Sequence, residues 1–211
     1  MAEIEIVPAI LVKTREEFAR KIALVAPYVK RVQIDIMDGK FVPNKTLAVE
    51  DFPPIPDSLL VEYHLMVENP LEYVKKIGKK GAIYELHLES LKDVAGAIAE
   101  VKKMGGKVDL AISPDTPAEE VLPYLSEIEQ VLVMTVYPGF SGQSYLARME
   151  GKMRILSENG AVVEVDGGID IGAARSAAAA GATLLGAASG IFAKPDIGRA
   201  IEELKKDAES A

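Results

Sequence analysis

The stretch "LVEYHLMVENPLEYVKKIGKKGAIYELHLES", residues 60–90, decides the fold. Its two ends, 60–67 and 83–90, are short runs rich in strand-forming residues. Between them, 70–81 opens with proline and ends in lysines followed by glycine, which is typical of a helix. A strand, a helix and a second strand within about 30 residues predict two parallel neighbouring strands.

The same alternation continues in both directions from this stretch. We expect six further strands, at 3–11, 31–38, 107–113, 130–137, 161–169 and 182–189. We expect helices at 14–29, where Thr14 and Glu17 form a capping box, and at 91–106, 117–128 and 197–210. The connection 46–58 is too rich in proline for more than a single turn.

Eight strands alternating with helices predict a (β/α)8 TIM barrel that forms one domain over residues 1–211. The alternative is an open doubly wound sheet. No G-x-G-x-x-G motif stands at the first strand-to-helix turn, which disfavours that alternative. Both folds place function at the carboxyl ends of the strands.

Composition excludes several classes of function. The chain has 24 basic and 32 acidic residues and a net charge of -8, which argues against a nucleic-acid partner. It has no cysteine, so disulfides, thiolate metal sites and a cysteine nucleophile are excluded. No apolar run is long enough for a membrane span, and "MAEIEIVPAIL" does not resemble a signal peptide. We therefore expect a cytoplasmic protein with no membrane partner.

Polar side chains gather at the ends of four predicted strands. Because residues i and i+2 share a face of a strand, Gln33 lies beside Asp35, and Glu164 beside Asp166; His64 lies on another strand. Asp35 and Asp166 facing each other could act as base and acid on a substrate, and with His64 they could hold a divalent metal. The competing interpretation is that each aspartate only caps the turn after it.

Two further groups of strand residues are ambiguous from spacing alone. His87 is interpreted as structural, with Glu89 as its hydrogen-bond partner. Met37, Met66 and Met134 stand near strand ends, where they either fill the core or form an apolar floor for a ligand.

Glycine-rich loops follow the last three strands, at 137–145, 166–169 and 188–192. Such loops expose backbone N–H groups, and barrels often bind phosphate with the loops after their late strands. Three loops in succession predict a phosphorylated substrate whose reacting carbons face Asp35 and Asp166.

Taken together, these residues resemble the ribulose-phosphate 3-epimerase family. The matching pieces include "VPAIL" (7–11), "IDIMDGKFVPN" (34–44), "HLMVENP" (64–70), "VLVMTVYPGFSGQ" (131–143), "EVDGGI" (164–169) and "AGATLLGAASGIF" (180–192). The resemblance implies a TIM barrel that interconverts D-ribulose 5-phosphate and D-xylulose 5-phosphate through a 2,3-enediolate. One aspartate would remove the C3 proton and the other would return a proton from the opposite face.

The resemblance also implies roles for individual residues. The acid/base pair would be Asp35 and Asp166, and the metal ligands would be Asp35, His64, Asp166 and whatever Gln33 can supply. The substrate and its phosphate would contact His64, Gly139, Phe140, Ser141, Gly142, Gly167, Gly168, Ala188 and Ser189. The pocket would be lined by Met37, Met66, Met134, Ala9 and Tyr137. Proteins of this family often self-associate, so we expect a homo-oligomer.

Five residues depart from the family pattern, and all of them fall at the expected site: Gln33 in place of a histidine ligand, Ala9 in place of serine, Tyr137, Ser141 and Ala188. An amide oxygen is a poorer zinc ligand than imidazole, so we expect the affinity for zinc to fall or the preference to shift toward manganese or magnesium.

The sequence leaves open an epimerase that acts on a related ketose phosphate, and it leaves open two other classes of function. A lyase such as hexulose-phosphate synthase would need a D-x-K-x-x-D pattern, but "DIMDGK" puts Lys40 out in the loop. The other alternative is a sugar-phosphate-binding protein without catalysis, which would have no need for two opposed carboxylates.

Overall fold

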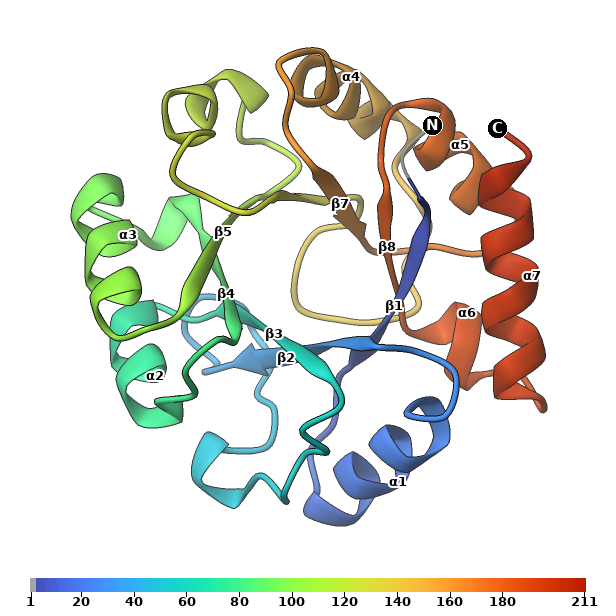
Figure 1. Ribbon diagram of the computed structural model, residues 1–211, viewed down its shortest axis with the longest axis horizontal. Coiled ribbons are helices and arrows are strands. Elements are labelled where there is room, and N and C mark those ends of the chain that lie inside the picture. Colours follow the sequence, from blue (N-terminus) through green and yellow to red (C-terminus); the bar gives the residue numbers. More distant parts are fainter. Residues whose placement is uncertain (1–2) are drawn as a thin grey trace.

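A computed structural model describes residues 3–211 and shows eight parallel strands closed into a barrel, each hydrogen-bonded to the next and the last to the first. The helices surround the ring of strands (Figure 1). The strands are β1 (Glu5–Ile10), β2 (Arg31–Met37), β3 (Leu60–Met66), β4 (Ile83–His87), β5 (Lys107–Ile112), β6 (Val131–Met134), β7 (Val163–Asp166) and β8 (Leu184–Ala187). The predicted TIM barrel is confirmed, and the open sheet is wrong because β1 pairs with β8.

The helices are α1 (Arg15–Val25), α2 (Pro70–Ile77), α3 (Val94–Lys103), α4 (Glu150–Glu158), α5 (Ala173–Ala179), α6 (Ser189–Phe192) and α7 (Ile197–Glu209). Four of the five expected helices are present as α1, α2, α3 and α7, and α4, α5 and α6 were not predicted. No helix in the described part of the chain is long and apolar enough to cross a membrane. Thr14 caps α1 by accepting a hydrogen bond from the backbone N–H of Glu17 at 3.2 Å, as predicted. The proline-rich connection holds a single 3-10 turn, Val49–Asp51.

The predicted helix at 117–128 is wrong. This segment forms two short 3-10 turns, Ala118–Glu120 and Leu122–Tyr124. Pro123 stands in its middle, and proline has no backbone N–H to continue an α-helix. The acidic residues that suggested a helix start therefore lie in a shorter turn.

The two faces of the barrel wall differ in chemistry. The outward side chains of the strands, such as Ile34, Leu65 and Val165, belong to the main hydrophobic core between strands and helices. The inward side chains include buried charged and amide groups, among them Gln33 and Glu62. Because side chains alternate along a strand, polar residues at every second position lie inside the barrel. The interior therefore carries the chemistry, and the outer layer supplies the apolar burial.

Candidate active site

A pocket opens at the carboxyl ends of the strands, where a TIM barrel carries its active site. The loop after β6 extends across the barrel in Figure 1 and forms part of the pocket wall. The predicted site residues that line the pocket are Asp35, Met37, Met66, Met134, Gly139, Phe140, Ser141, Gly142, Asp166, Gly167, Gly168, Ala188 and Ser189. The three methionines line the pocket and also belong to two small buried hydrophobic clusters, so their contact with a ligand stays a prediction.

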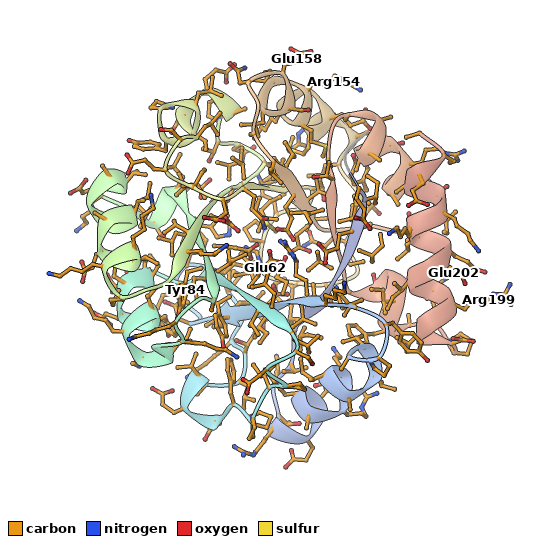
Figure 2. All side chains as sticks on the ribbon, in the orientation of Figure 1. Glu62, Tyr84, Arg154, Glu158, Arg199 and Glu202 are labelled. Atoms are coloured by element: carbon orange, nitrogen blue, oxygen red, sulfur yellow. The ribbon has the colours of Figure 1, made fainter. Side chains whose placement is uncertain are left out.

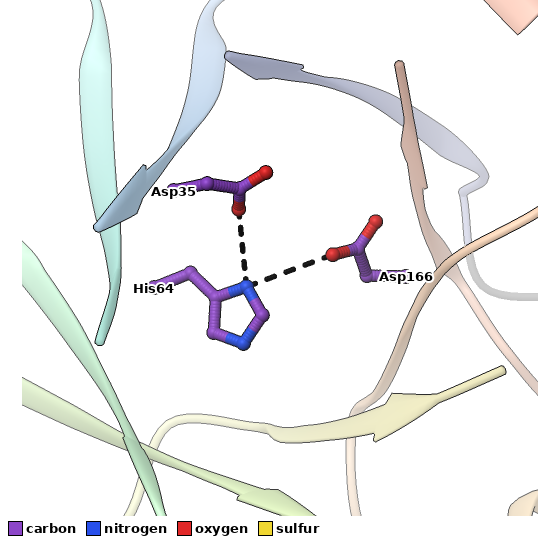
Figure 3. A group of neighbouring side chains, drawn as sticks. All are labelled: Asp35, His64 and Asp166. Carbon is purple, nitrogen blue, oxygen red and sulfur yellow. Dashed lines mark hydrogen bonds and ion pairs between the residues drawn. The ribbon is translucent and has the colours of Figure 1, made fainter. Parts of the chain in front are cut away.

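Three side chains converge at the base of this pocket (Figure 3). Nδ1 of His64 lies 3.1 Å from Oδ1 of Asp35 and 3.6 Å from Oδ2 of Asp166. Asp35 stands two residues before the end of β2, and His64 lies opposite it on the adjacent β3. Asp166 ends β7, which is not a neighbour of either strand in the ring. One donor atom from each residue lies within 4.8 Å of the others. Two carboxylates and an imidazole nitrogen at this spacing are a donor set that suits a divalent cation.

Gln33 lies among these three residues and contacts all of them through its amide nitrogen. Nε2 donates to Oδ1 of Asp35 at 2.8 Å and to Oδ2 of Asp166 at 3.0 Å, and it lies 3.2 Å from Nδ1 of His64. Its carbonyl oxygen is buried and has no hydrogen-bond partner among the described residues. In this conformation Gln33 therefore donates hydrogen bonds to the two carboxylates. Its amide nitrogen, and not its carbonyl oxygen, faces the three potential metal ligands.

Burial shifts the protonation of the three converging residues. Desolvation raises the pKa of Asp35 to about 6, against the hydrogen bond from Gln33. Desolvation and the neighbouring Asp35 raise the pKa of Asp166 to about 6. Desolvation lowers the pKa of His64 to about 4, so its imidazole is neutral near pH 7. Two carboxyl groups that titrate close to neutrality suit proton transfer in both directions.

A line of hydrogen bonds runs from the triad to the neighbouring strand. Nε2 of His64 lies 2.9 Å from Nε2 of His87, and Nδ1 of His87 lies 3.1 Å from Oε2 of Glu89. Although Glu89 is partly desolvated, hydrogen bonds from His87, Thr116 and the Ser113 N–H lower its pKa to about 2. An ionised Glu89 must accept from Nδ1–H of His87.

The line of hydrogen bonds from Glu89 favours the tautomer of His64 that carries its proton on Nε2, whereas Asp35 at 3.1 Å from Nδ1 favours the other tautomer when no cation is bound. Once Nδ1 of His87 carries the proton, its Nε2 is an acceptor and takes the hydrogen of Nε2 of His64. The lone pair of Nδ1 of His64 then faces the two aspartates. The predicted pairing of His87 with Glu89 is confirmed, but His87 also contacts a site residue, which its sequence position alone did not indicate.

The glycine loops close over the pocket through specific contacts. The side-chain amide of Gln143 donates to the carbonyl oxygens of Tyr137 and Phe140, at 2.7 and 2.9 Å, and holds the loop after β6 in a tight turn. Gly168 has a φ of +69°, and a Cβ atom there would collide with the backbone of Tyr145. Gln143 lies within the "VYPGFSGQ" piece, but sequence reasoning assigned it no role.

Gly168→Ala is expected to lower the free energy of unfolding by about 1–3 kcal/mol, because a side chain is strained at positive φ and meets backbone. Gly151→Ala is the matched control, since Gly151 lies in α4 with nothing within 4 Å of an added Cβ. Urea unfolding of both variants measures the difference. A Gly168→Ala protein as stable as the wild type would contradict this account of the loop.

Two predicted lining residues lie elsewhere. Tyr137 is half exposed, and its hydroxyl donates to Asp115 at 2.9 Å, so its ring points away from the pocket. Ala9 is buried in β1 opposite Gln33 and does not line the pocket. Both were placed by resemblance alone, and the direction of an exposed loop side chain such as Tyr137 depends on contacts across the fold.

Comparison of the sequence with known proteins identifies a family. Residues 5–192 match the model of the ribulose-phosphate 3 epimerase family. The chain belongs to the ribulose-phosphate 3-epimerase family. The resemblance seen in the sequence is thereby confirmed over nearly the whole chain.

Relatives in this family come from distant organisms. The cytoplasmic isoform of ribulose-phosphate 3-epimerase from Oryza sativa is 37% identical over 193 residues, which are 85% of this chain and 83% of the relative. The ribulose-phosphate 3-epimerase of Methanocaldococcus jannaschii is 39% identical over 183 residues, which are 83% of this chain and 78% of the relative. Both relatives are epimerases by name.

Solved structures confirm the fold independently. The 3-hexulose-6-phosphate synthase of Salmonella typhimurium superposes with a TM-score of 0.71 at 14% sequence identity, covering 98% of this chain and 99% of that one. At this identity the similarity concerns the barrel and carries no information on the reaction.

Proposed function

We propose that this protein is a metal-dependent ketose-phosphate 3-epimerase that interconverts D-ribulose 5-phosphate and D-xylulose 5-phosphate. The observation that carries the proposal is the pair of buried carboxylates, Asp35 and Asp166, which approach one Gln33 nitrogen from strands on different sides of the barrel. Family membership supports the same reaction.

The reaction needs a base on one face of C3 and an acid on the other. One aspartate removes the C3 proton of the ketose, and the electrons move into the adjacent carbonyl to give an enediolate. The second aspartate then delivers a proton to the opposite face of C3, which inverts that centre. Because each carboxyl has a pKa of about 6, either can begin as base or as acid, and the reaction runs in both directions.

Asp35, His64 and Asp166 would hold the divalent cation, with the Nδ1 lone pair of His64 directed at it. When bound, such an ion supplies Lewis-acid stabilisation of the developing oxygen charge. The donor set fits an ion, but the amide nitrogen of Gln33 lies at the point on which the three donors converge. A cation must therefore displace this amide, which lowers the affinity for every divalent ion. The absence of a second imidazole lowers the affinity most for zinc, so manganese or magnesium gains relative to zinc.

The pocket loops would bind the phosphate end of the substrate. Gly139, Gly142, Gly168 and Ser189 surround the opening beyond the aspartates. Backbone N–H groups of glycine loops and the start of a short helix suit an anion in an acidic protein. Met66 and its two companions would face the carbon skeleton of the sugar.

The lyase alternative is less well supported. Lys40 lies in the loop after β2, where its Nζ pairs with Glu68 at 3.3 Å, so it stands apart from the aspartates in the pocket. A pure binding protein would not require two carboxylates buried without a permanent countercharge, which is costly.

Product analysis tests the proposal. The purified protein, with its metal content measured, is incubated with D-ribulose 5-phosphate alone and with added formaldehyde. We expect D-xylulose 5-phosphate in both reactions and its loss on chelation. If a hexulose phosphate forms with formaldehyde and no D-xylulose 5-phosphate forms in either reaction, the result would contradict the proposal and support the lyase.

Glu89→Gln is expected to weaken cation affinity by about 10–100-fold, because the line through His87 no longer favours the His64 tautomer with its proton on Nε2. Long-range ¹H–¹⁵N NMR of the two imidazoles reports that tautomer directly in metal-free protein. Glu127→Gln, an exposed change, is the control. An unchanged His64 tautomer in Glu89→Gln would contradict the positioning role.

A further inference from the structure

A second group of carboxylates lies inside the barrel, one layer below the active site. It consists of Glu62, Glu85, Asp109 and Glu164, from β3, β4, β5 and β7. Each residue stands two positions before the inward-facing residue that its strand places in the layer of the active site. Two residues of a strand span roughly 7 Å, which separates the two layers. Figure 2 shows Glu62 at the centre of the ring of strands. We call these four residues the lower carboxylate cage.

The cage carries more negative charge than its neighbours compensate. All four side chains are fully buried. Arg31 pairs with Glu62 at 2.5 Å, and the amide of Gln130 donates to Glu62 at 2.8 Å and also to Glu164. The backbone N–H of Gln130 donates to Asp109 at 3.0 Å. One guanidinium against four carboxylates leaves three negative charges without a partner when all are ionised.

Glu85 differs from the other three cage residues. Neither of its carboxylate oxygens meets an amide, hydroxyl or cationic donor in the described part of the chain, although the side chain is completely buried; only another acid, Glu164, lies close enough to share a proton with it. Glu62, Asp109 and Glu164 each have one further oxygen without a partner. Glu85 is aimed into the cage, since one oxygen from each of the four residues lies within 4.8 Å of the others. Buried carboxylate oxygens are normally hydrogen-bonded or bound to a cation.

We propose that the lower carboxylate cage binds a hard divalent cation, for which Ca²⁺ fits best, at a site separate from the active site. All of its donors are carboxylate oxygens, the ligand type that Ca²⁺, Mg²⁺ and Mn²⁺ prefer. Oxygens up to 4.8 Å apart match Ca²⁺–O distances of about 2.3–2.6 Å on either side of one ion. A divalent charge would leave one uncompensated negative charge in place of three.

The position of the cage indicates a structural ion. It joins four strands near the amino-terminal end of the barrel, where residues serve stability and not catalysis. Bound Ca²⁺ is therefore expected to raise the unfolding temperature without taking part in turnover. The competing occupants are protons, since burial raises the pKa of Glu85, Asp109 and Glu164 well above the usual range.

The test uses protein stripped with chelator, unfolded and refolded in Ca²⁺, Mg²⁺ or Mn²⁺, because the site is enclosed. Thermal unfolding and native mass spectrometry are compared for the wild type and for Glu85→Gln, Asp35→Asn and the exposed control Glu120→Gln. We expect one of the ions, foremost Ca²⁺, to raise the unfolding temperature of the wild type, Asp35→Asn and Glu120→Gln, and to raise that of Glu85→Gln by less than the wild type, because only the active-site donors remain to bind it. Asp35→Asn should retain one bound ion.

Two outcomes would overturn the proposal. One is an equal cation-dependent shift in Glu85→Gln and the wild type, which would place the ion elsewhere. The other is an Asp35→Asn protein that retains no ion and whose unfolding temperature no cation raises. This result would mean that protons, and not a cation, neutralise the lower carboxylate cage. If Glu85→Gln does not fold, Asp109→Asn replaces it with the same expectation. The inference does not depend on the epimerase activity.

Discussion

Asp35→Asn and Asp166→Asn, made singly, are each expected to lower the rate of epimerisation by on the order of 10²–10⁴-fold. An asparagine keeps the shape of the side chain but can neither accept nor return the C3 proton. Inversion needs both carboxylates, so neither aspartate can compensate for the loss of the other. The rates are measured by the formation of D-xylulose 5-phosphate from D-ribulose 5-phosphate, with Asp57→Asn at an exposed position as the control.

The same two variants should separate proton removal from inversion. Each retains the aspartate that faces one epimer, so in deuterated water one variant should exchange the C3 hydrogen of D-ribulose 5-phosphate only. The other variant should exchange that of D-xylulose 5-phosphate only. Exchange of both epimers by either single variant would show that one residue serves both faces and would contradict the two-aspartate account.

Gln33→His is expected to raise the affinity for zinc by at least about 10-fold. The amide nitrogen now lies 2.8–3.2 Å from three would-be ligands and is a hydrogen-bond donor, so it opposes a cation at that point. An imidazole offers a lone pair in place of the donor N–H and adds a fourth ligand. Isothermal titration of chelator-stripped protein with zinc measures the change.

Gln33→Leu is the matched variant for this experiment. It removes the amide donor without adding a ligand, so it separates relief of competition from gain of coordination. We expect zinc affinity to be highest in Gln33→His, lower in Gln33→Leu and lowest in the wild type. Equal affinities for Gln33→His and the wild type would show that Gln33 does not limit metal binding.

Much of the site was predictable because barrel geometry converts sequence spacing into position. Asp35 and Asp166 each stand two positions after another polar residue, so alternation places both side chains on the inner face of their strands. Because the strands close into a barrel, their carboxyl ends meet at one opening, and the two aspartates lie close together there. The glycine loops around Gly168 were predictable for the same reason, since they end neighbouring strands.

Other features depended on contacts that spacing does not encode. The contact between His64 and His87 requires two ring orientations across neighbouring strands in addition to their register. The direction of the Gln33 amide is set by the two carboxylates it serves. The lower cage was also missed, because Glu62 and Asp109 lie on separate strands and no motif in the sequence links them to Glu85 and Glu164.

Proton NMR of D-ribulose 5-phosphate in deuterated water, with purified protein of known metal content, tests the central claim most directly. The account predicts deuterium entering at C3 together with the appearance of D-xylulose 5-phosphate, and the loss of both on chelation. No exchange and no epimer, even with zinc, manganese or magnesium added, would contradict the proposed 3-epimerase.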